Sequence, residues 1–230
     1  MLFAAPFTGG FIALNSGYKN EKLLKSLIAF AGGYIFSITI LRVIPEVFEV
    51  HNAYTPLLIL AGFFFQVLIG KFSEGTEHGH LHVHTHNHNM ALPIVLYLSL
   101  CIHSFTEGLP IGIMPNINSM MCVGIALHEL PAAFALMSIL QTEHIRKNYI
   151  VTLLLAYSLM SPLGALAGDS MKFHFSELLF HEILAFVSGI FLYISTTILF
   201  ENSENHHFST RKLLAVLSGV MAAIGISYIF

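Results

Sequence analysis

The chain has 230 residues, of which 55% are hydrophobic and only 10% are charged. Soluble domains carry about 25% charged residues, so this composition excludes an ordinary soluble protein. The formal net charge is −3, and the absence of a basic patch argues against a nucleic-acid partner. The two cysteines, Cys101 and Cys122, lie in apolar runs and are predicted to be buried without a disulfide. We therefore expect an all-α, polytopic membrane protein with a single transmembrane domain over residues 1–230.

Eight segments approach the length of about 20 apolar residues that a helix needs to cross a bilayer. The first begins at Met1 without a basic region or a clean cleavage signal, so we expect a membrane helix there, not a cleaved signal peptide. The predicted transmembrane helices cover residues 1–16, 24–48, 54–71, 91–113, 118–141, 149–168, 178–200 and 212–230.

Lysines and arginines predict the orientation of these helices, because positively charged short loops prefer the cytoplasm. With the N-terminus outside, the cytoplasmic loops are residues 17–23, 72–90, 142–148 and 201–211. These loops and their edges hold Lys19, Lys22, Lys25, Lys71, Arg146, Lys147, Arg211 and Lys212. The outer loops keep only Lys172, and Arg42 lies within the second helix. Both termini are therefore expected on the extracytoplasmic side.

The stretch 72–90, between the third and fourth helices, is too polar to span and is expected to form a cytoplasmic loop. Histidines alternate there with small or polar residues, at His78, His80, His82, His84, His86 and His88. Such a tract is suited to binding metal loosely, either to receive it in the cytoplasm or to sense its level. The alternative is a solvated loop that binds metal incidentally.

The fourth segment carries metal-competent side chains inside an apolar run. His103 and Glu107 are four residues apart, so they share one helix face, with Ser104 beside them. An ionisable group at bilayer depth is costly and is a functional-site hypothesis by default. Imidazole nitrogen with carboxylate oxygen suits zinc, iron(II) and manganese. The cluster contains no thiolate, which argues against a copper(I) site.

The fifth segment carries a second patch, His128 and Glu129, at a similar depth. Pro131 follows this patch and Pro110 follows the first, and each proline removes an amide donor and predicts a break in its helix. Broken helices at mid-membrane are typical of transporters. Because a short link joins the two segments, we expect both patches to form one divalent-metal site inside a transporter.

Glycines also predict how these two helices pack. Gly108 and Gly112 lie in the fourth segment and Gly124 lies in the fifth. Small residues let membrane helices approach closely, so we expect the two helices to pack directly against each other.

Other interpretations compete with transport. A buried histidine in a membrane helix is often only a hydrogen-bond partner, but two His and two Glu on adjacent helices disfavour a purely structural role. His128-Glu129 also begins an H-E-x-x-H zinc protease motif, whose second histidine would fall at Ala132, so we expect no enzyme. A membrane sensor or receptor that binds metal without transporting it is the alternative function.

The two patches resemble signatures of the ZIP (Zrt/Irt-like protein) family of metal transporters. His103-Ser104-x-x-Glu107-Gly108 is similar to the family's fourth-helix signature H-[NS]-x-x-[DE]-G. His128-Glu129-x-Pro131 is similar to the fifth-helix pattern H-[EK]-x-P. Eight helices, outer termini and a His-rich loop after the third helix also agree with the family.

Weaker matches extend the resemblance along the chain. Ser161-Pro162-Leu163-Gly164 and Leu192-Tyr193 are similar to family patterns in the sixth and seventh helices. Relatives often carry H-x-x-P-E in the second helix, where this chain has Arg42 in place of the histidine and retains Pro45 and Glu46. Glu46 is thus a weaker candidate ligand at the outer mouth, or an ordinary acidic residue at the interface.

The resemblance implies roles for five side chains: one metal position formed by His103, Glu107 and His128, and a second to which Ser104 and Glu129 contribute. Many relatives carry a further Glu where this chain has Ala133, so the second position is expected to hold metal poorly or not at all. The cation is the transported substrate, and no cofactor is required. Zinc is favoured, with Fe2+, Mn2+ and Cd2+ also accepted by such ligands.

The family resemblance also implies uptake into the cytoplasm, a homodimer within the lipid bilayer, and a moving bundle of the first, fourth, fifth and sixth helices. Minimal loops and the lack of a targeting segment favour a bacterial inner membrane over the membrane of an organelle.

Overall fold

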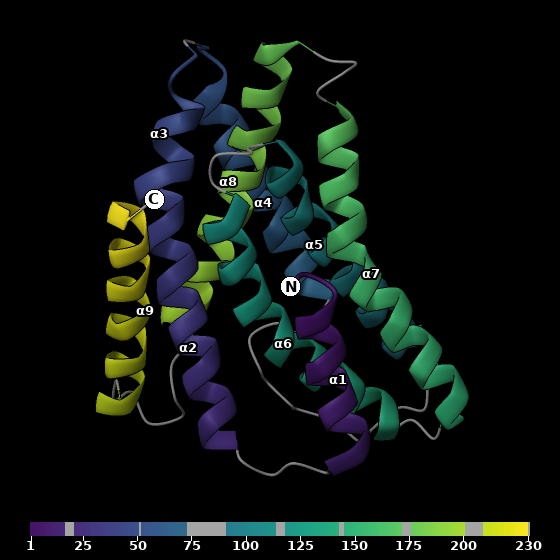
Figure 1. Cartoon of the computed structure of the whole chain (residues 1–230). Coiled ribbons are helices and arrows are strands. Elements are labelled where there is room, and N and C mark those ends of the chain that lie inside the picture. Colours follow the sequence, from purple (N-terminus) through teal and green to yellow (C-terminus); the bar gives the residue numbers. More distant parts are fainter. Residues whose placement is uncertain are drawn as a thin grey trace.

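The computed structural model describes residues 1–16, 21–50, 52–72, 91–113, 118–142, 145–171, 176–200 and 209–229. Within these residues the chain is helical and contains no strand. The helices are α1 (Ala4–Ser16), α2 (Glu21–Ile38), α3 (Ile44–Val47), α4 (Thr55–Phe72), α5 (Ala91–Ile113), α6 (Asn118–Thr142), α7 (Lys147–Met171), α8 (Glu177–Phe200) and α9 (Thr210–Ile229). They form one elongated bundle (Figure 1). The all-α prediction is therefore confirmed.

Six membrane spans are long and apolar enough to cross a bilayer within the described residues. Five are α5 to α9, and the sixth, Lys25–Val47, runs from α2 through α3. The other two predicted segments are shorter: α1 has 13 residues, and α4 contributes a shorter apolar helix, Thr55–Lys71. All eight predicted segments are thus helical, and the orientation of the termini stays a prediction. Cys101 and Cys122 are free thiols; Cys101 is buried, as predicted, whereas Cys122 is only half-buried.

A π-helical turn, η1 (Thr39–Val43), connects α2 to α3 where the sequence predicted an uninterrupted helix. The amide of Ile44 donates to the carbonyl of Thr39, five residues earlier, just before Pro45. Because proline cannot donate, the backbone widens here at little extra cost. Arg42 lies in this turn, and its guanidinium donates a hydrogen bond to the Ser227 carbonyl of α9. The Arg42 side chain, at the position where the family resemblance places histidine, therefore connects η1 to α9.

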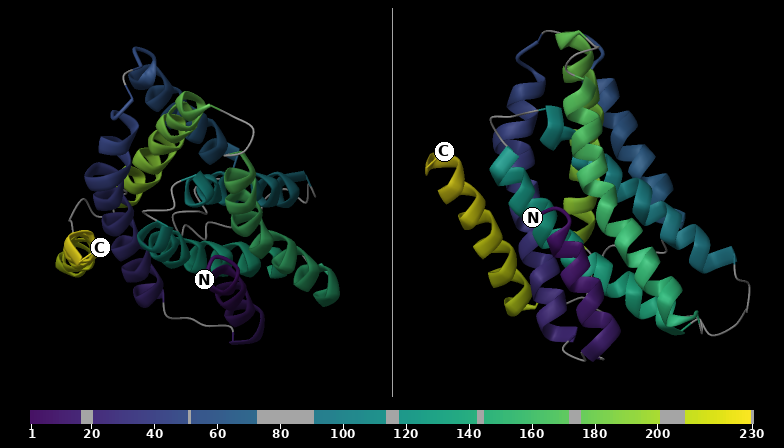
Figure 2. Two further views of the ribbon diagram at one scale, coloured as in Figure 1. Left: turned by 45° about the horizontal axis from the view of Figure 1, so that its top comes forward. Right: turned by 45° about the vertical axis from the view of Figure 1, so that its right-hand side comes forward.

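The helices pack most extensively in four pairs: α5 with α7, α1 with α6, α2 with α9, and α4 with α8. Figure 2 shows α9 at the edge of the bundle against α2, and α1 against α6. The pairs can be divided into two groups of four helices, following the moving bundle that the family resemblance predicts. One group contains α1, α5, α6 and α7, and the other contains α2, α4, α8 and α9. The groups meet mainly where α2 packs on α6 and where α5 packs on α4 and α8.

Each of the four pairs has glycine at its closest approach, where an added Cβ would overlap the partner's backbone. The glycines are Gly108, Gly112, Gly164 and Gly168 between α5 and α7; Gly9 between α1 and α6; Gly33 and Gly219 between α2 and α9; and Gly62 and Gly189 between α4 and α8. Without a hydrophobic driving force in lipid, such close backbone packing is a main source of helix association. Each pair is therefore tightly held.

The predicted role of glycine between α5 and α6 was wrong. Gly108 and Gly112 lie against the backbone of α7, at Ser161 and Ala165, because α7 presents a matching glycine pair at Gly164 and Gly168. Gly124 of α6 faces the ring of Tyr34 in α2.

The predicted helix breaks at the prolines are also absent. α5 runs through Pro110 and α6 runs through Pro131, with both prolines inside continuous helices. Each proline still lacks an amide donor, but neighbouring helices hold the backbone in helical form at this depth.

Replacing Gly112 with Ala tests the close packing of α5 on α7. The new methyl group would overlap the carbonyl oxygen of Ala165, and overpacking of this kind costs about 1–3 kcal/mol. We expect Gly112→Ala to lower the thermal unfolding temperature in detergent micelles.

The matched control is Gly225→Ala, because nothing lies within 4 Å of a Cβ added there. This substitution should leave the unfolding temperature unchanged or raise it, since Ala is the better helix former. Equal melting of the two variants would contradict the packing described above.

Candidate metal centre

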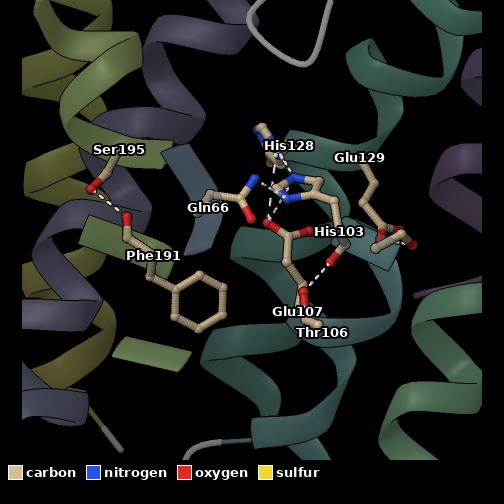
Figure 3. A network of polar contacts seen from close by, with 9 residues as sticks. Gln66, His103, Thr106, Glu107, His128, Glu129, Phe191 and Ser195 are labelled. Carbon is tan, nitrogen blue, oxygen red and sulfur yellow. Dashed lines mark hydrogen bonds and ion pairs between the residues drawn. The ribbon is translucent and has the colours of Figure 1, made fainter. Parts of the chain in front are cut away.

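Three ionisable side chains from α5 and α6 meet in the interior of the bundle. His103 and Glu107 lie one turn apart on the same face of α5, and His128 projects from α6 toward them (Figure 3). Their exposed fractions are 1%, 0% and 0%. The structure thus brings the two sequence patches to one level, as their depth predicted.

The distances between these side chains are short. Nε2 of His103 lies 3.5 Å from Oε1 of Glu107, and Nε2 of His128 lies 3.8 Å from the same oxygen. The two Nε2 atoms are 3.3 Å apart. Two nitrogens bound to one zinc ion at about 2.0–2.1 Å in a tetrahedral site would also lie about 3.3 Å apart. The imidazoles are therefore already spaced for a zinc ion, and the carboxylate needs to move only a few tenths of an ångström.

The charge of the cluster favours a cation. The Glu107 carboxylate is fully buried among helices that are mostly apolar, where an uncompensated ionised group is costly. Two neutral imidazoles offer lone pairs but no positive charge. A divalent cation between the three groups would compensate the carboxylate charge and could use each group as a ligand.

Ser104 and Glu129 form a separate pair beside this cluster. The Ser104 hydroxyl donates to Oε1 of Glu129 at 2.5 Å, and both residues are fully buried. In Figure 3 the Glu129 side chain points away from Gln66, on the far side of His103. Its second oxygen, Oε2, has no hydrogen-bond partner among the described residues. The Ser161 hydroxyl of α7 also has no hydrogen-bond partner among the described residues.

Gln66 of α4 is a site neighbour that the sequence interpretation missed. Its exposed fraction is 0%, and its amide Nε2 lies 2.8 Å from Nδ1 of His103. The available signal was a lone amide in an otherwise apolar run, Ala61 to Ile69, on the segment before the fourth. The sequence interpretation placed the site in the fourth and fifth segments and did not consider this residue of the third.

The weaker candidate ligands do not join the cluster within the described residues. Glu46 is half-buried in α3 and is absent from the three-residue group. The histidines of the predicted 72–90 loop, from His78 to His88, lie outside the described residues.

A small, mostly apolar pocket lies between α2, η1, α6 and α8. Gly124 and Ile125 in its wall are on α6, about one turn before His128. The Tyr34 hydroxyl in the wall donates to the Met120 carbonyl at 3.1 Å. This lining of mostly aliphatic and aromatic side chains is a poor ligand set for a cation.

A family model described as ZIP zinc transporter matches residues 71–227. Zinc transporter ZIP9-B of Xenopus laevis is 28% identical over 157 residues, which is 63% of this chain and 51% of that protein. Zinc transporter ZIP1 of Bos taurus is 27% identical over 179 residues, covering 71% of this chain and 55% of that protein. Zinc transporter ZIP2 of Homo sapiens is 30% identical over 128 residues, covering 53% and 41%.

The chain spans about half the length of the curated relatives it matches. These relatives are vertebrate proteins, so they give no support to the predicted bacterial inner membrane. The six membrane spans among the described residues agree with an integral, multi-pass membrane protein. Because the family model covers more than half of the sequence, the chain belongs to the ZIP zinc transporter family.

Proposed function

We propose that this protein transports divalent metal cations across a membrane, with zinc as the favoured substrate. His103, Glu107 and His128 are the proposed ligands of the transported ion. The observation that carries the proposal is their position: two imidazoles and a carboxylate, fully buried in membrane-spanning helices, with nitrogens spaced for one zinc ion. Iron(II), manganese and cadmium fit the same ligand types, because nitrogen and carboxylate oxygen accept them all.

The arrangement suits transient binding better than permanent storage. Three protein ligands leave one tetrahedral position open for water or an exchanging ligand, as in zinc sites that turn over. Structural zinc sites are usually closed by four ligands, often thiolates. Ala132 occupies the place of the second protease histidine, which supports a transporter over a hydrolase.

The packing supports relative movement of the two groups of helices. The proposed ligands lie on α5 and α6, within the group α1, α5, α6 and α7. The family resemblance predicts that this group of helices moves. Within each of the four helix pairs, glycine packs against the backbone of the partner helix. At the boundary between the groups, Gly124 of α6 instead packs against the side chains of α2, mainly that of Tyr34. We propose that the first group carries the ion past the second toward the cytoplasm.

Several features of the proposal rest on the sequence and family resemblance alone. These features are the position of both termini on the extracytoplasmic side, the assembly of two chains into a homodimer, and the capture of metal by the histidines of the 72–90 loop. The relative charge of the loops supports the orientation.

Glu107 provides the most direct test of the site. Glu107→Ala removes the anionic ligand, so the loss of zinc affinity should exceed the roughly 10- to 100-fold loss typical of an outer-shell partner. Radiolabelled zinc uptake into proteoliposomes is expected to fall to the level of protein-free liposomes. The matched control is Glu182→Ala, which removes the hydrogen bond from Asn52 but touches no proposed ligand.

Normal flux through Glu107→Ala would refute the site assignment. Zinc binding by the unaltered protein, with flux no higher than in empty liposomes, would instead favour the metal sensor.

Acidification should weaken zinc uptake. Imidazole and carboxylate must be deprotonated to bind metal, so protons compete with zinc for all three ligands. With equal pH on both sides of the liposome membrane, the apparent KM for zinc should be higher at acidic pH than at neutral pH. Faster uptake on acidification would contradict this competition.

Equilibrium dialysis with zinc should find one tightly bound ion per chain once the loop histidines are replaced by serine. The second position lacks a further carboxylate at Ala133, and one oxygen of Glu129 already accepts from Ser104. The Glu129→Gln variant should therefore still bind one zinc ion tightly, and the Glu107→Gln variant should lose this tightly bound ion. Two tight ions per chain would show that the Ser104 and Glu129 pair forms a full second site.

A further inference from the structure

Gln66 reaches the metal ligands from a different helix group. Gln66 lies on α4, which belongs with α8, α2 and α9. Its side-chain nitrogen, Nε2, nevertheless lies 2.8 Å from Nδ1 of His103 on α5 (Figure 3). The amide contacts Nδ1, the ring nitrogen on the side away from the cluster, while Nε2 faces His128 and Glu107. A buried amide is costly unless it is hydrogen-bonded, and the contact with Nδ1 of His103 provides a partner for the Gln66 nitrogen.

The contact bears on which nitrogen of His103 carries the proton. A neutral imidazole has one N–H and one lone pair. A metal ion at Nε2 uses the lone pair there, so the proton must sit on Nδ1 and needs an acceptor. Without metal, one of the facing Nε2 atoms of His103 and His128 must carry a proton to form their 3.3 Å contact.

A primary amide can serve both states. Its nitrogen donates and its oxygen accepts, and a half-turn about the last side-chain bond exchanges the two. With nitrogen toward Nδ1, the amide donates, and Nε2 of His103 keeps the proton. With oxygen toward Nδ1, the amide accepts, and the lone pair at Nε2 is available to metal. The ring holds one proton in both states, so only its location changes.

We propose that Gln66 is a positioning residue that selects the tautomer of His103 and reverses its amide when zinc binds. The amide donates to Nδ1 in the metal-free state and accepts from the Nδ1 proton in the zinc-bound state. This inference rests on the proposed function of the His103, Glu107 and His128 site. It assigns Gln66 no direct contact with the ion.

The test compares Gln66→Met with Gln66→Glu in the full chain. Methionine has nearly the same length but cannot form the bond, so the KM for zinc uptake into proteoliposomes should rise about 10- to 100-fold, the usual cost of losing an outer-shell partner. The maximal rate should be unchanged or higher. Glutamate can accept from the Nδ1 proton, so Gln66→Glu should restore the KM to the wild-type value or below. It should also reduce the maximal rate, because it favours the zinc-bound state.

Binding of Co2+ to the detergent-purified protein supplies a second readout. Visible absorption of bound cobalt reports its ligand geometry, and Gln66→Met should weaken binding and shift the bands. Gln141→Met is the matched control, because this amide also bonds another helix, donating to the Ala13 carbonyl at 3.0 Å without touching a ligand. It should change neither the KM nor the cobalt spectrum. If Gln66→Met does not fold, Gln66→Asn replaces it, since the shorter amide cannot reach Nδ1.

Unchanged KM and cobalt binding in Gln66→Met would overturn the inference, as would equal impairment in Gln66→Met and Gln66→Glu. Glu107→Ala in the same assays separates this failure from failure of the proposed function. If Glu107→Ala loses zinc while Gln66→Met does not, the site stands and Gln66 has no positioning role. If neither loses zinc, the site itself is wrong.

Discussion

A carboxylate that is ionised beside two imidazoles, at the centre of an apolar helix bundle, is stabilised by a compensating positive charge. Desolvating a single ion costs several kcal/mol even after the surrounding protein relaxes. At this position Glu107, His103 and His128 have almost no exposed surface, and the two Nε2 atoms stand 3.3 Å apart. A divalent cation would supply that charge, with the three side chains as its ligands. This constraint connects the buried cluster to the proposed metal transport.

The rest of the bundle places these ligands. On α5, Gly108 follows Glu107 by one residue, which turns it about 100° around the helix. The ligand face can thus look toward α6 and α4 while the glycine face lies on the backbone of α7. The glycine face of α5 therefore holds the helix against α7, while another face carries the candidate metal ligands. The contact of Gln66 with His103 also crosses the boundary between the two helix groups, so sliding of one group past the other would break it.

The sequence predicted the helices and the metal-ligand candidates because their signals are local. Long apolar runs marked the segments, and the spacing of His103 and Glu107 placed both on one face. Partners between distant segments could not be predicted in this way. Gly108 fits α7 because Gly164 and Gly168 match it, and Gln66 meets His103 across the bundle. The prolines predicted helix breaks, whereas packing keeps both helices continuous. The π turn before Pro45 also depends on contacts beyond its own segment.

X-ray absorption at the zinc edge tests the central claim most directly. The sample is the zinc-loaded full chain with its loop histidines replaced by serine, so that the intramembrane site dominates the signal. The account predicts a shell of nitrogen and oxygen at about 2.0–2.1 Å, with the outer scattering of two imidazoles. A shell that lacks imidazole, or one that contains sulfur at about 2.3 Å, would contradict it.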